Sequence, residues 1–511
     1  MAIALPQQIF NQFKGIREIN GVNSGGQISA LSAVNVEFFN SDIGNGVGIR
    51  TVETSQLFKS LPTGYKAIKV FVSNQDGVDY LLIYGENAEQ GVLYYVDGAG
   101  IIQTIVDDLS VTGQANGLTM QYGQYDVFIF TNGTDKYSVC FAQNPIYQEI
   151  TAEDNQGRTI NWLSMTEWNG FLVVASDYGV HSSHKNDIYT WDDVVDDVAD
   201  SWYIDFGKKV TAVAAFATGL FIFTEDDISH LNTTPNDAEN ALLSSVAMNG
   251  CFSYESLVAH GTYLFFYDDK QKNIFYIMQT DTGQTRPTGP VAQEIQSYFN
   301  GTVERCKLYS CIYSTKNEIW MILNDKVLIF DYFQQEFVER KQSSINSICK
   351  YNNKIYSAGD SGQIRVEKQN GYNSWYEPCE YRTCIINMGS NTNLKKQKTP
   401  ILLVLNENYT NDFFVEITAD YKEKNPKKIV VKVENQGMWA GADDELDQYN
   451  QWGVSFWCDE NPYKKRVMEI STPQTWYNIS LRIYTEEAGQ GFSIESIELK
   501  RLKEKTKTKG R

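Results

Sequence analysis

The sequence predicts an all-β protein: a β-propeller of about seven blades, a small C-terminal β-sandwich after it and an extended N-terminal arm before it. Three observations lead to this prediction. Short aromatic or β-branched runs recur through residues 61–375 at an average spacing of about 46 residues, which is the length of one four-stranded blade. Alternating apolar and polar residues begin near residue 376, a pattern typical of half-buried strands. Residues 1–60 scatter their apolar side chains among Gly, Asn and Ser.

The composition excludes several classes of protein. With 31 Tyr, 26 Phe and 10 Trp in 511 residues, the chain has too much ring surface to stay disordered. No apolar run approaches the roughly 20 residues of a membrane-spanning helix, and the opening residues lack the basic start of a standard secretion signal. The net charge of −19 argues against a surface that grips nucleic acid, because such binding depends on Lys and Arg neutralising phosphates. It does not exclude a passage through which nucleic acid slides.

The N-terminal arm, residues 1–60, is expected either to dock on a neighbouring protein or to close the propeller by donating a strand. Water would penalise its large apolar side chains if they stayed exposed. The predicted docking residues of the arm are therefore Ile9, Phe10, Phe13, Phe38 and Phe39. Deleting the first 20 residues is expected to weaken attachment to a neighbour and to leave the propeller folded.

Seven strong runs mark the predicted propeller, and Gly, Asn or Asp turn signals flank each of them. The runs are residues 79–85, 126–132, 171–176, 220–225, 263–268, 319–324 and 355–360, and their starts lie 36 to 56 residues apart. A weak turn precedes the strong run in several units and another strand follows it, so each unit is expected to begin as a hairpin. Because the period is irregular, a pair of β-sandwiches with accidental spacing remains the alternative.

The C-terminal region, residues 376–511, predicts the β-sandwich through its alternating strands. Its final dozen residues hold seven basic residues and one acidic residue. Such a charge block either stays solvated or docks on an acidic or phosphate-bearing partner. The predicted docking residues here are Lys503, Lys505, Lys507, Lys509 and Arg511. Any attachment that depends on them should be most evident at low ionic strength, where charges are least screened.

Three segments have residues that could carry chemistry, but each has a simpler interpretation. His181 and His184 would straddle the pleat of a strand and are interpreted as surface histidines of a turn. Residues 184–191 end in Thr-Trp, as the Asp-box of sialidase-type propellers does, but a blade turn packed by Trp191 explains them better. The acidic run 192–197 lacks the residue order of a Ca²⁺ loop and is interpreted as a solvated insertion.

Other signatures of catalysis are missing from the sequence. Neither a nucleophile elbow nor a phosphate-binding loop occurs. The 8 Cys are scattered without a C-x-x-C pair, so they are interpreted as buried thiols in a reducing compartment. The sequence therefore predicts no catalytic, cofactor-binding or metal-ligating residue, and a protein that is not an enzyme.

A series of short motifs runs through the middle of the chain. They are residues 161–170, Ser182, Trp191, 204–207, 213–216, 220–228 and 250–256, with an earlier match at residues 33–37 and Arg50. These motifs resemble the tail-hub, or packaged-DNA stabilisation, proteins of short-tailed bacteriophages. The resemblance covers about residues 30–370, and the C-terminal sandwich and basic tail depart from it.

The resemblance implies a structural virion protein. Identical subunits would form a ring, usually six-fold, below the portal and adaptor proteins and above distal tail or fibre proteins. This hub or nozzle ring would retain the packaged genome and form part of the ejection channel, through which double-stranded DNA passes without specific binding. The implied location is the virion tail, assembled in the host cytoplasm.

Two other functions remain open on the sequence. One is a glycan-binding or glycan-cleaving propeller that recognises a receptor, for which hydrolysis would need paired acids at one rim. The other is a cellular scaffolding propeller, which the fold would explain equally well.

Overall fold

The computed structural model describes most of the propeller region and a smaller share of the two ends. The described residues are 2–4, 8–10, 12–16, 27–41, 46–52, 55–143, 146–154, 156–191, 197–217, 219–236, 243–279, 285–288, 298–313, 316–324, 326–332, 334–341, 344–367, 378–386, 394–397, 400–406, 412–420, 427–431, 465–470, 475–487, 490–499 and 502–505.

The chain divides into two compact units. Unit 1 comprises residues 1–54, 334–341 and 370–511, and unit 2 comprises residues 55–333 and 342–369. These bounds differ from the predicted division at residues 60 and 375. Residues 1–54 belong to the same unit as the C-terminal region, and so do residues 334–341, which the sequence placed inside the propeller. No helix in the described part of the chain is long and apolar enough to cross a membrane.

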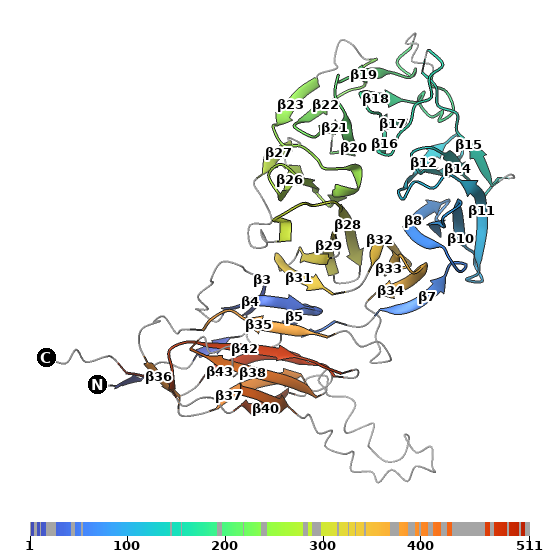
Figure 1. Ribbon diagram of the computed structural model, residues 1–511. Helices are drawn as coiled ribbons and strands as arrows, with labels where there is room; N and C mark the ends of the chain where they lie inside the picture. Colours follow the sequence, from blue (N-terminus) through green and yellow to red (C-terminus); the bar gives the residue numbers. More distant parts are fainter. Residues whose placement is uncertain are drawn as a thin grey trace, which may run out of the picture. The chain divides into compact units, whose positions relative to one another are not determined.

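Unit 2 is a β-propeller, and its described residues include six complete four-stranded blades arranged in a ring (Figure 1). The first five blades follow chain order: β8 (Lys66–Gln75), β9 (Val78–Glu86), β10 (Gly91–Val96), β11 (Ile102–Leu109); β12 (Asn116–Tyr122), β13 (Tyr125–Thr131), β14 (Lys136–Val139), β15 (Tyr147–Glu149); β16 (Met165–Trp168), β17 (Phe171–Ala175), β18 (Gly179–Ser182), β19 (Tyr203–Asp205); β20 (Val210–Phe216), β21 (Gly219–Thr224), β22 (Ile228–Leu231), β23 (Leu243–Ala247); and β24 (Leu257–His260), β25 (Tyr263–Asp268), β26 (Asn273–Gln279), β27 (Thr285–Thr288).

The closing blade combines strands from both ends of unit 2. It contains β32 (Ile345–Tyr351), β33 (Lys354–Gly359), β34 (Gln363–Glu367) and β7 (Gln56–Ser60), and β7 pairs antiparallel with β34. Residues 56–60 thus take the ring-closing role that was one of two alternatives for the N-terminal region. Between the fifth and closing blades, β28 (Cys306–Tyr313), β29 (Lys316–Leu323) and β30 (Lys326–Asp331) form a further antiparallel meander.

Each of the seven strong runs coincides with a second strand of a blade or meander: β9, β13, β17, β21, β25, β29 and β33. Every residue of β17 and of β21 is buried, because a second strand has a strand on each side and further blades over its faces. Such strands are apolar throughout. Each unit begins as a hairpin, as expected, and the strong run is its second strand, since a first strand such as β16 pairs antiparallel with it.

Unit 1 is a mixed sheet in which N-terminal strands pair with C-terminal strands, so blue strands lie beside orange-red ones in Figure 1. Its strands are β2 (Gln8–Phe10), β3 (Gln12–Ile16), β4 (Gln27–Val34), β5 (Val36–Ser41), β6 (Gly46–Thr51), β31 (Glu336–Arg340), β35 (Glu380–Thr383), β37 (Ile401–Asn406), β38 (Phe413–Ala419), β39 (Lys427–Val431), β40 (Lys465–Ile470), β42 (Ile479–Tyr484) and β43 (Ser493–Leu499). A separate small sheet runs β1 (Ala2–Ala4), β44 (Leu502–Lys505), β36 (Leu394–Gln397), β41 (Thr475–Trp476). The first and last strands of the chain are therefore paired with each other.

The N-terminal strands are part of the core of unit 1, which corrects the prediction of an extended docking arm. Phe13 is 1% exposed and Phe38 is 4% exposed. The backbone N–H of Gly15 donates to Glu336 Oε2 at 2.8 Å, and a Cβ at Gly15 would lie 2.4 Å from the carbonyl oxygen of Phe337. The strands β3 and β31 therefore lie in close contact. Because Phe13 and Phe38 are buried in unit 1, they are not available for docking.

Candidate functional site

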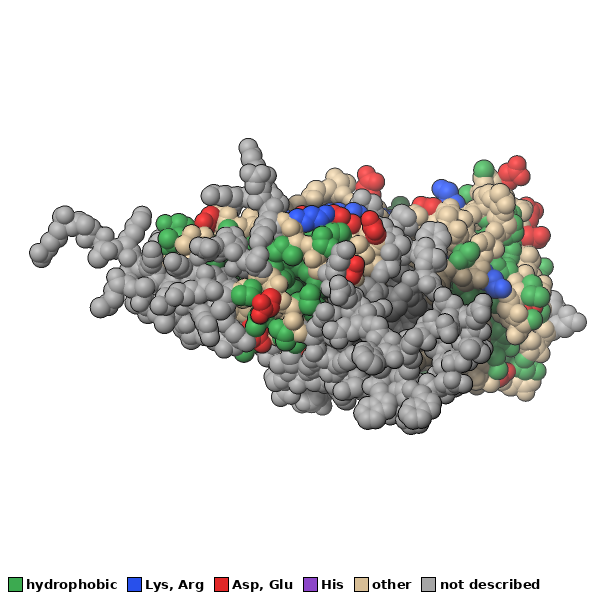
Figure 2. Space-filling view, turned by 90° about the horizontal axis from the view of Figure 1, so that it is seen from below, with side chains coloured by type: hydrophobic (Ala, Val, Ile, Leu, Met, Phe, Trp, Pro, Cys, Tyr) green, Lys and Arg blue, Asp and Glu red, His purple; other side chains and the backbone are tan. Residues whose placement is uncertain are grey.

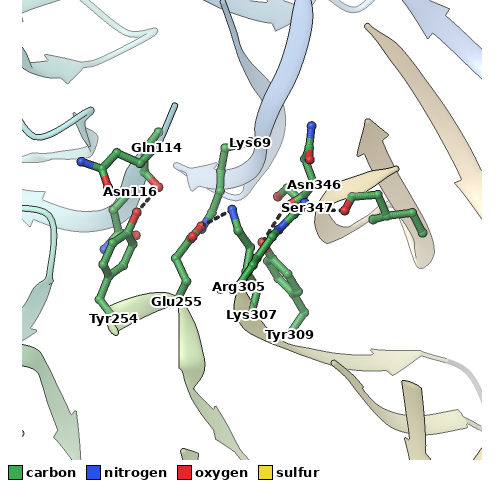
Figure 3. A network of polar contacts seen from close by, with 12 residues as sticks. Lys69, Gln114, Asn116, Tyr254, Glu255, Arg305, Lys307, Tyr309, Asn346 and Ser347 are labelled. Carbon is green, nitrogen blue, oxygen red and sulfur yellow. Dashed lines mark hydrogen bonds and ion pairs between the residues drawn. The ribbon is translucent and has the colours of Figure 1, made fainter. Parts of the chain in front are cut away.

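A buried ion cluster lies at the centre of the propeller (Figure 3). Glu255 Oε1 accepts a hydrogen bond from Lys69 Nζ at 2.8 Å and another from Lys307 Nζ at 2.7 Å. The side chains of Lys69, Glu255 and Lys307 are 10%, 13% and 8% exposed. We call these three residues the central triad. One carboxylate thus serves two lysines in a site largely removed from water.

The two ion pairs of the triad differ in reach: Glu255–Lys307 joins neighbouring parts of the ring, and Lys69–Glu255 joins parts that are not neighbours. Lys69 lies on the first strand of the first blade, Lys307 lies on β28, and Glu255 lies on the 3-10 helix η1 (Tyr254–Ser256), just before the fifth blade. The hydroxyl of Tyr254 also donates to the carbonyl oxygen of Ala115, next to the second blade, at 3.2 Å. The first and second blades are not adjacent to the fifth blade in ring order. The 3-10 helix η1 therefore reaches them across the centre.

Local hydrogen bonds explain why the chain turns into η1 at this point. The backbone N–H of Ser253 donates to Ser256 Oγ at 3.0 Å, and Ser256 Oγ donates to the carbonyl oxygen of Ser253 at 2.8 Å. The first of these bonds, from the N-cap backbone to the side chain of the third helical residue, is one half of the capping box of a helix start. It fixes the turn so that Tyr254 and Glu255, which lie between the two serines, project into the centre.

Aromatic and polar side chains surround the triad. Lys69 Nζ lies 5.6 Å from the ring centroids of both Tyr254 and Tyr309, a distance at which a ring face attracts a cation. The hydroxyl of Tyr309 is 3.4 Å from the carbonyl oxygen of Asn346, and Ser347 Oγ accepts the backbone N–H of Val70 at 3.1 Å. These hydrogen bonds tie β8, β28 and β32 together around the triad.

A third cation, Arg305, lies beside Lys307 and Tyr309 (Figure 3). Residues 305, 307 and 309 alternate along the chain, so they share one side of β28. Arg305 Nη2 donates to the carbonyl oxygen of Ile345 at 2.7 Å. Its Nε is buried and has no hydrogen-bond partner among the described residues.

The charges of the triad shift the pKa values of its members. Burial works to lower the pKa of Lys69, but the carboxylate of Glu255 outweighs it and raises that pKa above the ordinary value. Burial would raise the pKa of Glu255, and the two lysines instead lower it. For Lys307, burial together with the charge of Lys69 lowers the pKa to about 8, against the pull of Glu255. Of the two lysines of the triad, Lys307 is therefore the one that loses its proton more readily.

The two histidines singled out in the sequence have different environments. His181 is 8% exposed, and its ring centroid lies 4.4 Å from that of Tyr203, so its interpretation as a surface residue was wrong. His184 Nδ1 lies 3.7 Å from Asp200 Oδ1. The described residues contain no group of three His, Cys, Asp or Glu side chains that could hold a metal ion.

Trp191 is 3% exposed, and its ring stacks on that of Trp162 with 5.2 Å between centroids. Residues 184–191 therefore end in a core tryptophan, in agreement with the interpretation as a blade turn packed by Trp191. Residues 192–196 of the acidic run lie outside the described residues. The seven described cysteines are free, and all but Cys349 are fully buried.

The remaining predicted docking residues are only partly described. Ile9 is 39% exposed, and the Cζ of Arg50 lies 5.8 Å from the half-buried ring of Phe39. The backbone of β44 includes Lys503 and Lys505. The side chains of Phe10, Lys503 and Lys505, and all of Lys507, Lys509 and Arg511, lie outside the described part. These docking roles stay predictions.

The central triad was not predicted, although the sequence contains a signal for it. Lys69 interrupts the otherwise apolar Ala67–Val72 stretch of β8, and Arg305, Lys307 and Tyr309 alternate with apolar residues. A charge inside an apolar strand predicts a buried partner. The identity of that partner could not be read from the sequence, because Glu255 comes from a different part of the ring.

Comparisons with known proteins give no family for this chain. No family model matches it, and no curated protein matches it. Among solved structures, the N-terminal domain of Nup159 is 10% identical, with 66% of this chain and 98% of that chain covered and a TM-score of 0.36.

Two further structures are similar at the same level. BamB from Moraxella catarrhalis is 10% identical, with 73% of this chain and 100% of that chain covered and a TM-score of 0.36. The extracellular domain of a one-component system from B. thetaiotaomicron is 10% identical, with 83% of this chain and 61% of that chain covered and a TM-score of 0.44. None of these figures bears on function.

Proposed function

We propose that this chain is a structural virion protein, not an enzyme: a subunit of the tail-hub or nozzle ring of a short-tailed bacteriophage. Identical copies, six in number, surround the channel below the portal and adaptor proteins. The ring retains the packaged DNA and later conducts it to distal tail or fibre proteins. The sequence motifs between residues 30 and 370 supply the phage assignment.

The observation that carries the structural role is the closure of the propeller across its centre. The Lys69–Glu255 ion pair links the first blade to the segment before the fifth blade, two parts of the ring that are not neighbours. Glycan cleavage needs two carboxyl groups, one that acts as the general acid and one that acts as the base or nucleophile. The triad holds one carboxylate and two lysines, a composition that suits a rigid scaffold better than such hydrolysis.

The arrangement of the termini supports a second role for unit 1. Both ends of the chain are built into unit 1, so the propeller is inserted between two halves of one β-structure. We propose that unit 1 is the small β-sandwich and forms the contacts between subunits, since a ring closes through identical heterologous contacts. We further propose that β28–β30 belong to a seventh blade.

The charge distribution is consistent with DNA passage without specific binding. On the face shown in Figure 2, acidic and basic side chains of the described residues are interspersed with hydrophobic ones and form no continuous basic patch. The whole chain has a net charge of −19. Phosphates therefore meet few cations that would release counterions and slow the transit of DNA.

The test is to disrupt the gene in the phage that encodes it and to complement the defect with the plasmid-borne chain. We expect disrupted particles to package DNA and then lose it, and complementation to restore both DNA retention and infectivity. Purified infectious particles should contain the chain at a fixed ratio to the portal protein. Infectious particles that lack the chain, or normal DNA retention after disruption, would overturn the proposal.

A further inference from the structure

The centre of the propeller carries more positive than negative charge. Three cations lie there: Lys69 of β8, Lys307 of β28, and Arg305, the residue just before β28. Glu255 from η1 is the carboxylate that pairs with two of them. Buried charges are costly unless they are paired, so this site is electrostatically incomplete.

The other described groups around the triad do not complete it. Tyr254 and Tyr309 have pKa values raised by burial and are neutral near pH 7. The thiol of Cys306 likewise has a pKa raised by burial. The facing side chains of β32 and of the segment leading into β12 are uncharged: Asn346, Ser347, Gln114 and Asn116 (Figure 3).

We propose that the centre of the propeller binds one small inorganic oxyanion, of the sulfate or phosphate class, between Lys307 and Arg305. Two features of the geometry point to this ligand. Arg305 Nε is a buried donor without a partner among the described residues, and it lies on the same side of the chain as Lys307. Oxyanions accept several charge-assisted hydrogen bonds, and the planar guanidinium group matches them well.

The burial of the site limits the size of the ligand. The triad side chains are at most 13% exposed, so the backbone of a DNA duplex cannot reach them. The inference does not depend on the tail-hub assignment, because it concerns the charge balance inside one propeller. Its test is therefore independent of phage assembly.

Anion binding and proton binding at Lys307 should be coupled. Without the anion, the site relieves its excess charge by releasing the Lys307 proton at a pKa of about 8. A bound anion favours the protonated lysine, and by reciprocity the proton favours the anion. Above that pKa each pH unit lowers anion affinity about tenfold, so sulfate should bind about tenfold more weakly at pH 9 than at pH 7.

The experiment is a sulfate titration of the full chain, followed by isothermal calorimetry and by thermal unfolding. Sulfate is the probe because its charge is constant between pH 7 and pH 9. Sodium chloride keeps the ionic strength fixed, and sulfate is kept below about 20 mM to limit its general stabilising effect on proteins. Lys307→Met removes one proposed ligand. Lys354→Met removes an exposed lysine of β33 and is the matched control.

We expect saturable sulfate binding and a higher melting temperature in the wild type and in Lys354→Met, and neither effect in Lys307→Met. If Lys307→Met does not fold, the pH dependence of wild-type binding still tests the proposal. Equal binding at pH 7 and pH 9, an equal response in Lys307→Met, or an adventitious ion only, seen as a non-saturable response, would overturn it. So would stabilisation by a short DNA duplex and not by sulfate.

Discussion

The central triad predicts that its single carboxylate matters far more than either lysine alone. Glu255→Gln preserves the shape of the side chain but leaves Lys69 and Lys307 buried without a counterion. Removing one partner of a buried ion pair costs about 3 to 5 kcal/mol. For a unit of this size each kcal/mol lowers the melting temperature by about 2 to 4 °C, so we expect a loss of roughly 6 to 20 °C.

Lys307→Met should behave in the opposite way. Lowering the pKa of Lys307 from 10.5 to about 8 means that its charge costs about 3 kcal/mol in the folded state at pH 7. The substitution removes that cost together with one hydrogen bond, and it leaves Lys69 and Glu255 as a balanced pair. We expect its unfolding free energy to stay within about 2 kcal/mol of the wild type.

The pH dependence gives a second signature of the same charge. Because the unfolded state keeps the Lys307 proton up to pH 10.5 and the folded state releases it from about pH 8, the unfolded state binds more protons in this window. Wild-type stability relative to Lys307→Met should therefore rise between pH 8 and pH 10.5, by up to about 3 kcal/mol. Tyrosine ionisation affects both proteins and cancels in the difference.

Denaturant unfolding followed by tryptophan fluorescence measures these free energies, and hydrogen exchange in β8 and β28 assigns the change to the propeller. Glu304→Gln, which neutralises an exposed carboxylate, is the matched control and should match the wild type within about 0.5 kcal/mol. The reasoning is refuted if Glu255→Gln is as stable as this control. It is also refuted if Lys307→Met is as unstable as Glu255→Gln.

Three further predictions concern packing outside the triad. Phe13→Ala should destabilise unit 1 by about 3 to 5 kcal/mol, because the ring is buried and lies edge-on to Tyr381 with 5.6 Å between centroids; unchanged hydrogen exchange in β3 and β4 would contradict this. Deleting residues 1–20 should accordingly unfold unit 1 as well as weaken any attachment. Trp191→Ala should cost about 3 to 5 kcal/mol through the lost Trp162 stack, and His184→Ala should cost under about 1 kcal/mol; similar melting temperatures for the two variants would count against the assigned roles.

The propeller could be predicted from the sequence because buried strands consist mainly of apolar residues. Second strands such as β17 and β21 are buried along their whole length, so they appear as apolar runs with a regular spacing. First strands line the centre and mix polar with apolar residues, as β12 does. Their pattern is weaker, so the first strands of the blades were not predicted.

The N-terminal region was misjudged for a related reason. Its strands are short and rich in small residues, and several of their partners, among them β31, β35 and β43, lie hundreds of residues away. Local patterns cannot identify such pairings, because they depend on loop closure between the two ends of the chain. The triad escaped prediction in the same way, since residues 69, 255 and 307 meet only after the ring has formed.

The most direct test of the tail-hub proposal is a cryo-electron microscopy reconstruction of the connector in intact particles of the phage that encodes this chain. The account predicts a closed ring of identical subunits below the portal and adaptor, usually six-fold, with the propeller and the mixed sheet of unit 1 recognisable in each subunit and DNA density on the ring axis. A connector in which no density fits this chain, or one in which it occurs only as isolated copies away from the channel, would contradict the account.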